Sequence, residues 1–442
     1  MSFLNRLFGR NTSNKDQPDI SFGRYSDAYK DDAQYDAWDK AIEQFEKENY
    51  LDSYQTFFSY LRDEKEDNVT FELDKGVLTF EFMQGSRKIK GTATSKKVVA
   101  KAKIVKTNKN LKVNFMRRLL EQNYDLKYSR FCLDTDDHLA IIFDTYSVDG
   151  SPYKLYYALK ELATNADKQD DLLLDEFRSL DAIDTDHLKS IPIAEKEAKY
   201  KYINRAIQKV VDEVKSDKLD ANQYPGGIAY LLLDLVYRLD FLTKPEGFMM
   251  EALERIHRLY FANAGQPSPE KNSILLKELE QLLERPKEDY FKEMYQTTST
   301  FGITTAVNYS RVVSFIEGEL GNMYWYDDNG YDKVACSVPG YIVGYCLFNY
   351  AVPKPCKDLF QLYYQIMEPG YFHNLGFQPY RTKDGTFDVK GIKKAIKKLA
   401  DLYGSKYEGF APNTSVLEFK SSTAFAMSYL KMMEVLEMTK VD

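Results

Sequence analysis

The feature that most constrains the fold is a change in the spacing of apolar residues along the chain. In "NVTFELDKGVLTFEF", residues 68–82, and in "KKVVAKAKIVKT", residues 96–107, apolar residues recur at alternate positions. This period is typical of β-strands that bury one face. From about residue 186 onward the apolar residues recur instead at the spacing of amphipathic helices. Strands followed by a long run of helices predict an α+β fold.

Helical segments surround these strands in the sequence. Residues 33–62 place apolar residues at helical spacing on either side of the turn "KENY", which predicts a helical hairpin. We expect a helix over residues 113–123, further strands over 124–135 and 138–148, and a long helix over 153–177. The predicted order is therefore a helical hairpin, three strands, a helix, two strands and a helix.

This order resembles the YbjN family and the related type III secretion chaperone fold (CesT/Tir-chaperone-like) over residues 68–177. The resemblance rests on the element order, on the last hairpin "FCLD…HLAIIFDT" and on the helix "KLYYALKELATNAD" that follows it. It implies a bacterial domain with one antiparallel sheet and helices on one face. It also implies a non-enzymatic protein that holds a partner polypeptide on the sheet, or between the sheets of a homodimer. The helical N-terminal extension and the large C-terminal half depart from the small members of the family.

Changes in composition divide the chain into three predicted parts. Residues 1–30 form a flexible polar tail and linker, which Pro18 and Gly23 interrupt. Residues 31–182 form the mixed domain, and residues 183–442 form a mainly helical domain. The apolar residues of the first segment share helical spacing: Phe3, Leu4, Leu7 and Phe8. We expect a frayed tail there, and the alternative is a short interfacial helix in weak contact with a membrane.

The stretch "RFCLDTDDHLAIIFDT" concentrates carboxylates beside a histidine. Its polar members are Asp134, Asp136, Asp137, His138 and Asp144. A calcium loop of the EF-hand type would need a glycine at its turn and a glutamate at its end. Here the later positions are apolar and alternate as a strand does, and Asp favours turns. The stretch therefore predicts a hairpin with an acidic tip and no metal site. A second acidic run, residues 167–176, is interpreted as the solvated face at the end of a helix.

The strongest charge signal is a segment without acidic residues between Phe82 and Leu120. It holds twelve basic residues: Arg87, Lys88, Lys90, Lys96, Lys97, Lys101, Lys103, Lys106, Lys109, Lys112, Arg117 and Arg118. Such segregation produces a field of one sign, which attracts phosphates, anionic lipid or an acidic polypeptide. The predicted surface for an acidic protein partner consists of Lys96, Lys97, Lys101, Lys103 and Lys106. An alternative role for these lysines is to block aggregation at a sheet edge.

The sequence lacks the common catalytic and cofactor motifs. It contains no phosphate loop, no G-x-S-x-G and no HExxH. The cysteines are few and fit no zinc spacing, which favours a reducing, cytoplasmic location. No aromatic residue lies between Phe82 and Phe115 to stack on bases, so we expect no nucleic-acid partner. We predict a cytoplasmic interaction protein without a cofactor. The alternative is a small-ligand-binding protein or an enzyme whose site lies in the aromatic-rich C-terminal half.

Overall fold

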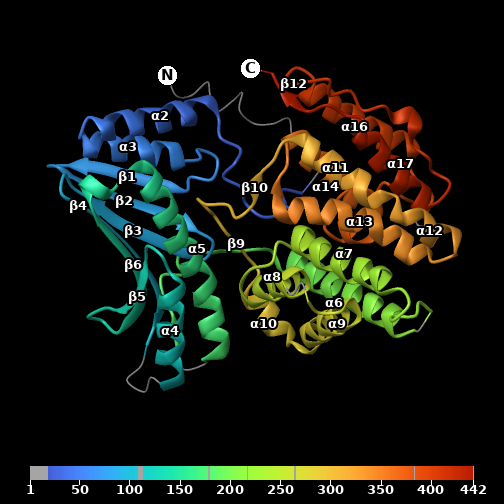
Figure 1. The fold of residues 1–442 in the computed structure, drawn as a ribbon, viewed down its shortest axis with the longest axis horizontal. Coiled ribbons are helices and arrows are strands. Elements are labelled where there is room, and N and C mark those ends of the chain that lie inside the picture. Colours follow the sequence, from blue (N-terminus) through green and yellow to red (C-terminus); the bar gives the residue numbers. More distant parts are fainter. Residues whose placement is uncertain are drawn as a thin grey trace.

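Two halves lie side by side in the computed structural model, one built around a β-sheet and one built of helices (Figure 1). The predicted α+β fold is therefore confirmed, with the sheet in the N-terminal half. No helix among the residues described is long and apolar enough to cross a membrane. The structure describes residues 18–107, 113–177, 180–216, 218–262, 265–382 and 384–441. Outside these ranges lie the residues for which membrane contact is the alternative prediction, Phe3, Leu4, Leu7 and Phe8.

One antiparallel sheet forms the centre of the N-terminal half. Its strands are β1 Val69–Asp74, β2 Val77–Gln84, β3 Arg87–Ala93, β4 Lys97–Lys106, β5 Arg130–Leu133, β6 His138–Tyr146 and β7 Asp181–Ala182. Their order is β1-β2-β3-β4-β6-β5, and β7 pairs with the end of β4. The helices of this half are α2 Asp32–Glu46, α3 Tyr50–Leu61, α4 Val113–Asp125 and α5 Pro152–Glu176. The predicted hairpin, α2 and α3, and both later helices are thereby confirmed.

Side-chain alternation decides how the sheet packs. On β4, Val98, Ala100 and Ala102 are buried, whereas Lys97 and Lys101 point to the opposite face. Helices α3 and α5 contact the sheet on its buried face (Figure 1). Because a strand has a period of two, one face joins the core and the other carries the lysines.

Strand β3 is absent from the sequence prediction. Its sequence "RKIKGTA" contains a glycine and only one large apolar residue, Ile89, so it shows no alternation of its own. It pairs with β2 on one side and β4 on the other. A Cβ at Gly91 would lie 2.2 Å from the ring of Phe80, so the absence of a side chain makes room for that ring. Tertiary pairing therefore creates this strand where the local pattern does not.

The C-terminal half is helical, as predicted. Its helices are α6 Ile193–Lys215, α7 Pro225–Thr243, α8 Gly247–Ala262, α9 Ser268–Glu284, α10 Lys287–Lys292, α11 Tyr309–Leu320, α12 Asn322–Asp328, α13 Asp332–Asn349, α14 Lys354–Met367, α15 Pro369–Asn374, α16 Val389–Tyr403 and α17 Ser422–Glu434. Helix α7 is buried along most of its length and contacts α6, α8, α9 and α13. Short strand pairs tie distant loops together: β8 Lys189–Ser190 with β9 Tyr295–Gln296, β10 Thr305–Ala306 with β11 Tyr350–Ala351, and β12 Tyr407–Glu408 with β13 Thr439–Lys440. Two short 3-10 helices complete the elements: Ser147–Asp149 and Thr414–Val416.

The two halves exchange an aromatic residue. Phe22, from the N-terminal segment, is 5% exposed and belongs to the core of the helical half. Phe301, from the helical half of the sequence, is 1% exposed and packs edge-on against Phe82 of β2, with ring centroids 5.7 Å apart. The side chain of Gln84 donates to the carbonyl of Phe301 at 3.2 Å and accepts from its amide at 2.9 Å. The hydrophobic core of each half therefore includes an aromatic residue from a segment that lies in the other half of the sequence.

Residues 18–30 correct the prediction of a flexible linker. The amide of Gly23 donates to the carbonyl of Phe241 at 2.8 Å. The hydroxyl of Tyr29 donates to the carbonyl of Val352 at 2.6 Å. These bonds satisfy polar groups of a segment that has no regular secondary structure. A polar, glycine-containing sequence is thus ordered by tertiary contacts that its composition does not indicate.

A buried ion pair joins the sheet to α5. Arg87 Nε on β3 lies 2.7 Å from Asp170 Oδ2 on α5, and the side chains are 2% and 0% exposed. The guanidinium also donates to the carbonyls of Ile104 and Ile183, at 2.9 and 3.0 Å. Arg87 therefore lies inside the protein and adds nothing to a basic surface. The acidic run at the end of α5 is only partly the solvated face that the sequence predicts, since Asp170 is buried whereas Asp175 and Glu176 are exposed.

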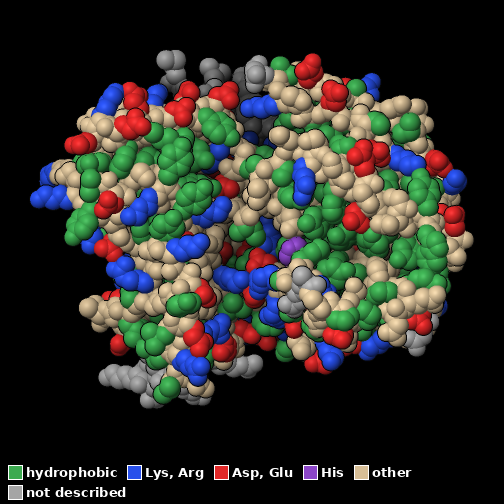
Figure 2. Space-filling model, viewed as in Figure 1, with side chains coloured by type: hydrophobic (Ala, Val, Ile, Leu, Met, Phe, Trp, Pro, Cys, Tyr) green, Lys and Arg blue, Asp and Glu red, His purple; other side chains and the backbone are tan. Residues whose placement is uncertain are grey.

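Helix α5 also carries contacts between the halves. Tyr295 donates to Asp171 at 3.0 Å, and Lys168 lies 3.3 Å from Glu254 of α8. A pocket of about 530 Å³ lies at this junction. The space-filling view shows a hollow between the halves in which basic and acidic side chains gather (Figure 2).

We expect Arg87→Met to lower the free energy of unfolding by about 3–5 kcal/mol, because the fully buried Asp170 would lose the cation that stabilises its carboxylate. The double variant Arg87→Met with Asp170→Leu should recover part of this loss, since it removes both charges. Urea denaturation followed by circular dichroism measures both. Lys97→Met is the control, because it breaks a half-exposed pair with Asp144 and should cost at most about 1 kcal/mol. A single Arg87 variant as stable as this control would contradict the prediction.

Candidate functional site

The five lysines of the predicted partner surface lie on and beside β4, but they are not equivalent. Lys97 Nζ lies 2.8 Å from Asp144 Oδ2, and Lys101 Nζ lies 2.8 Å from Asp134 Oδ2. These cross-strand pairs compensate both ammonium groups. Three lysines have no carboxylate within 4.0 Å in the described part of the chain: Lys96, Lys103 and Lys106. The available positive charge is therefore smaller than the sequence suggests.

The predicted hairpin with an acidic tip is confirmed by the antiparallel pairing of β5 and β6. One ligand atom each of Asp134, Asp136 and His138 lies within 4.8 Å of the others, a spacing that could hold a metal ion. Asp134 Oδ1, however, accepts from the amides of Asp136 and His138 at 3.0 and 2.9 Å, and Oδ2 accepts from Lys101. Burial opposes ionisation of Asp134, but these bonds hold its pKa well below the ordinary value. Both carboxylate oxygens of Asp134 already accept hydrogen bonds within the sheet half. The absence of a metal ion at this hairpin therefore stays our prediction.

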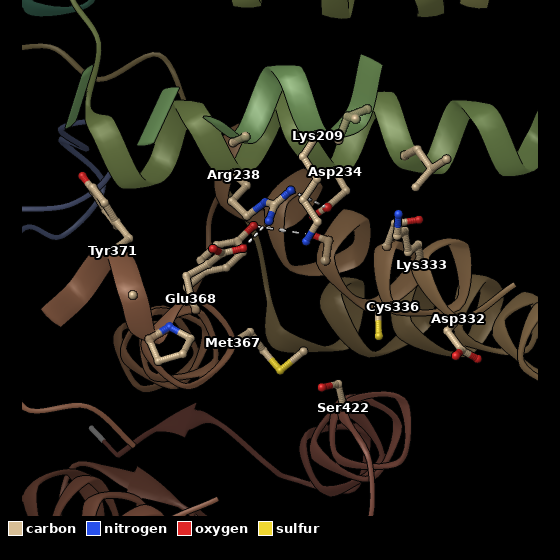
Figure 3. Close-up of a pocket in the computed structure, with 18 of the residues that line it drawn as sticks. Lys209, Asp234, Arg238, Asp332, Lys333, Cys336, Met367, Glu368, Tyr371 and Ser422 are labelled. Carbon is tan, nitrogen blue, oxygen red and sulfur yellow. Dashed lines mark hydrogen bonds and ion pairs between the residues drawn. The ribbon is translucent and has the colours of Figure 1, made fainter. Parts of the chain in front are cut away.

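A pocket of about 920 Å³ opens in the helical half (Figure 3). It lies between α6, α7 and α13 on one side and the chain from the end of α14 to α15 on the other, with α17 beside it. Both signs of charge line it: Arg205, Lys209, Glu213, Asp234, Arg238, Asp327, Asp332, Lys333, Glu368 and Arg381. Tyrosines of α6, α14 and α15 supply apolar surface beside these groups. Such a mixture of aromatic walls and convergent polar groups is typical of small-ligand sites.

An ion-pair network fixes one wall of this pocket. Arg238 on α7 lies 3.2 Å from Asp234 Oδ2, one turn earlier, and pairs with Glu368 at the end of α14. Gly340 on α13 makes this arrangement feasible, since a Cβ there would lie 2.1 Å from Asp234 Oδ1. Burial raises the pKa of Asp234 to about 6, although Arg238 opposes the shift. The wall therefore contains a carboxyl group that titrates near neutral pH.

Three buried polar atoms of the pocket lack a hydrogen-bond partner among the residues described: Tyr202 Oη, Arg238 Nε and Arg381 Nε. Buried polar groups are normally paired, so each of these needs an explanation. Arg381 bonds only to neutral atoms through its terminal nitrogens, Ser422 Oγ at 3.1 Å and Met367 Sδ at 3.3 Å. No carboxylate of the described chain lies within 4.0 Å of it. Burial accordingly lowers its pKa, as expected for a cation with too little compensation.

The lining favours binding over nucleophilic chemistry. Cys336 points into the pocket from α13 (Figure 3). Burial raises the pKa of its thiol to about 11, so the thiol stays protonated at neutral pH and is a weak nucleophile. No histidine is among the described residues that line the pocket. Asp234 could exchange a proton near neutrality, but its ion pair with Arg238 already occupies it.

Sequence reasoning placed an alternative site in this half without naming its residues. The available signal lay in "PGGIAYLLLDLVYRLDFLT", the sequence of α7, which is nearly all apolar yet contains Asp234, Arg238 and Asp240. Charges inside a buried helix require partners, and Asp234 and Arg238 share one face at four-residue spacing. Two other charged residues of the pocket, Glu368 and Arg381, come from later segments of the chain. No local sequence pattern indicates that these segments lie close to α7.

Comparison with models of known protein families and with curated proteins found no match for this chain. The resemblance of residues 68–177 to the YbjN family and to secretion chaperones therefore stays a prediction. Function has to be argued from the geometry of the sites.

We expect calcium, magnesium or manganese to leave the thermal midpoint unchanged, because a metal ion would have to displace the Lys101 ammonium from Asp134. Thermal melts with and without each ion measure this. The variant Asp136→Ala with Asp137→Ala is the comparison and should behave as the wild type does. A rise of several degrees that this variant abolishes would establish a metal site at the tip.

Proposed function

We propose that the helical half binds a small polar molecule that carries a carboxylate or phosphate group. The observation that supports this most is Arg381, a half-buried cation with an unpaired Nε and no carboxylate partner in the described chain. An anionic ligand would supply the missing charge. A guanidinium presents its donors in a planar fork that matches a carboxylate or phosphate in two-point contact.

The remaining lining suggests that the ligand has a body beyond its anionic group. A volume of about 920 Å³ is far larger than a single oxyanion and lies within the range of about 300–1,000 Å³ for ligand pockets. Tyr202 stacks on Tyr371 with ring centroids 4.2 Å apart and keeps its hydroxyl unpaired. A ligand that also offers a hydrogen-bonding group to this hydroxyl would satisfy it. We therefore favour a metabolite-sized compound over an inorganic ion.

Arg381→Met should weaken binding of this ligand by roughly tenfold to a hundredfold, because a hydrogen bond to a charged group contributes about 1.5–3 kcal/mol. Native mass spectrometry of the purified protein identifies a retained ligand. Calorimetry with a panel of dicarboxylates and phosphate monoesters measures the affinity. Arg381→Lys should fall between the wild type and Arg381→Met, since it keeps the charge but loses the fork.

Lys420→Met is the matched control, because it removes the same charge from an exposed side chain. It should leave the affinity unchanged. The proposal fails if Arg381→Met binds as tightly as the wild type. It also fails if the wild type retains no ligand and binds no member of the panel.

A second function, capture of an acidic polypeptide on the outer face of the sheet, is favoured by a separate observation. Lys96, Lys103 and Lys106 have no carboxylate partner in the described chain, although Asp134 and Asp144 compensate their neighbours. The resemblance to the YbjN family and to secretion chaperones implies a polypeptide held on this sheet. We propose this function as cytoplasmic and non-enzymatic.

Removing three lysines together, Lys96→Gln, Lys103→Gln and Lys106→Gln, should weaken binding of a fluorescent polyglutamate peptide without changing the thermal midpoint. These lysines make no ion pair that the fold would lose. Anisotropy titrations should also show binding fall with salt, since the Debye length drops from about 10 Å at 0.1 M to about 3 Å at 1 M.

Lys390→Gln, Lys394→Gln and Lys397→Gln on α16 form the control, because these exposed residues carry the same total charge. An equal loss in both triple variants would mean that net charge alone attracts the peptide.

A further inference from the structure

Lysines from both halves converge on a second pocket at their junction, which shares Arg24, Tyr25, Lys244, Thr297 and Ser299 with the pocket of about 530 Å³. The pocket has a volume of about 270 Å³ and lies between residues 21–30, the loop after α3, the end of α7 and the start of α14. Its lysines are Lys30, Lys65, Lys244, Lys354 and Lys357. None of them has a carboxylate within 4.0 Å in the described part of the protein. This cluster shares no residue with the pocket of Arg381 or with the lysines of β4.

Two of these ammonium groups are withdrawn from solvent. Lys30 is 9% exposed, and its Nζ lies 4.9 Å from the ring centroid of Tyr60. Lys357 is half-buried, and its Nζ lies 5.9 Å from the ring centroid of Tyr29. The aromatic faces orient these cations without neutralising them. Burial lowers the pKa of both lysines, and at Lys357 repulsion from neighbouring lysines adds to the shift.

The acidic groups of the pocket offset this charge only in part: Asp27 and Asp63 oppose the lowering of the pKa of Lys30, but neither lies within 4.0 Å of its ammonium group. Asp27 accepts from the hydroxyl of Tyr156 at 2.6 Å. Asp63 accepts from the amide of Lys65 at 2.9 Å, within its own loop. Glu66, the third acidic residue of the pocket, is exposed. The five lysines of the pocket therefore outnumber its three carboxylates, Asp27, Asp63 and Glu66.

We propose that this pocket binds a small polyvalent oxyanion of the phosphate or pyrophosphate class, which bridges the two halves. Several ammonium groups around one point are suited to phosphate oxygens, which accept from each of them. The volume admits such an anion and excludes a folded polypeptide. Lys30 precedes the sheet half, whereas Lys244 follows the end of α7 and Lys357 lies on α14 of the helical half, so a bound anion contacts both.

Calorimetry on the full chain with sodium pyrophosphate, inorganic phosphate and fructose 1,6-bisphosphate tests the proposal and separates a free anion from a phosphorylated metabolite. We expect saturable binding of at least one of them. Lys244→Met with Lys357→Met should weaken it about tenfold or more, because each lysine contributes a charged hydrogen bond. The anion should also raise the thermal midpoint of the wild type, since it binds the folded state, and this rise should disappear in the double variant.

Lys394→Met with Lys397→Met is the control of equal charge, from exposed positions on α16. It should bind as the wild type does, and Lys357→Arg, which keeps the charge, should retain binding. Circular dichroism confirms that each variant is folded, and Lys357→Met alone answers the same question if the double variant is not. Absence of binding by the wild type at millimolar anion, or an equal loss in the control, would overturn the proposal.

Discussion

The Arg87–Asp170 ion pair is the interaction on which the arrangement of the two halves depends. It fixes the C-terminal part of α5 against β3 deep inside the sheet half. The same stretch of α5 then bonds outward, because Asp171 accepts from Tyr295 and Lys168 pairs with acidic residues of α8. A charge so deeply buried is costly unless its partner and its hydrogen bonds are in place, which makes the position of the helix specific. The contacts between the two halves therefore depend on the position of α5.

Sequence periodicity predicted the helices and most strands of the sheet half because each of these elements buries one face of its own. It failed for β3, where Gly91 interrupts the pattern and pairing on both sides supplies the stability. It failed again for residues 18–30, whose order comes from bonds to distant backbone atoms. The pocket of Arg381 could not be predicted for the same reason, since its residues are distant in sequence and only the charges within α7 hinted at it.

Cations without a carboxylate partner in the described chain occur in all three proposed binding regions, although exposed lysines such as Lys394 and Lys397 of α16 lack one too. The chain has 67 acidic residues against 60 basic ones, so a lysine or arginine without a partner does not reflect a shortage of carboxylates. Lys97 and Lys101 show that partners are supplied where the fold needs them. Arg381 and Lys357 lack them although both side chains are half-buried, which costs more free energy than an unpaired charge at the surface. The geometry of these two regions therefore suits anions that arrive from outside.

The positions of Phe22 and Phe301 determine when each hydrophobic core can be completed during synthesis of the chain. Gln84 and its partner Phe301 lie 217 positions apart. At about 5–20 residues per second, the ribosome delivers Phe301 roughly 10–40 s after β2 has left the peptidyl transferase centre. During that interval the nascent sheet lacks Phe301, one of its aromatic core residues. Phe22 has already been synthesised, but the helical core that buries it has not formed. The sheet core can be completed only after Phe301 has been synthesised, and the helical core only after Met438, so apolar surface stays exposed on the nascent chain until then.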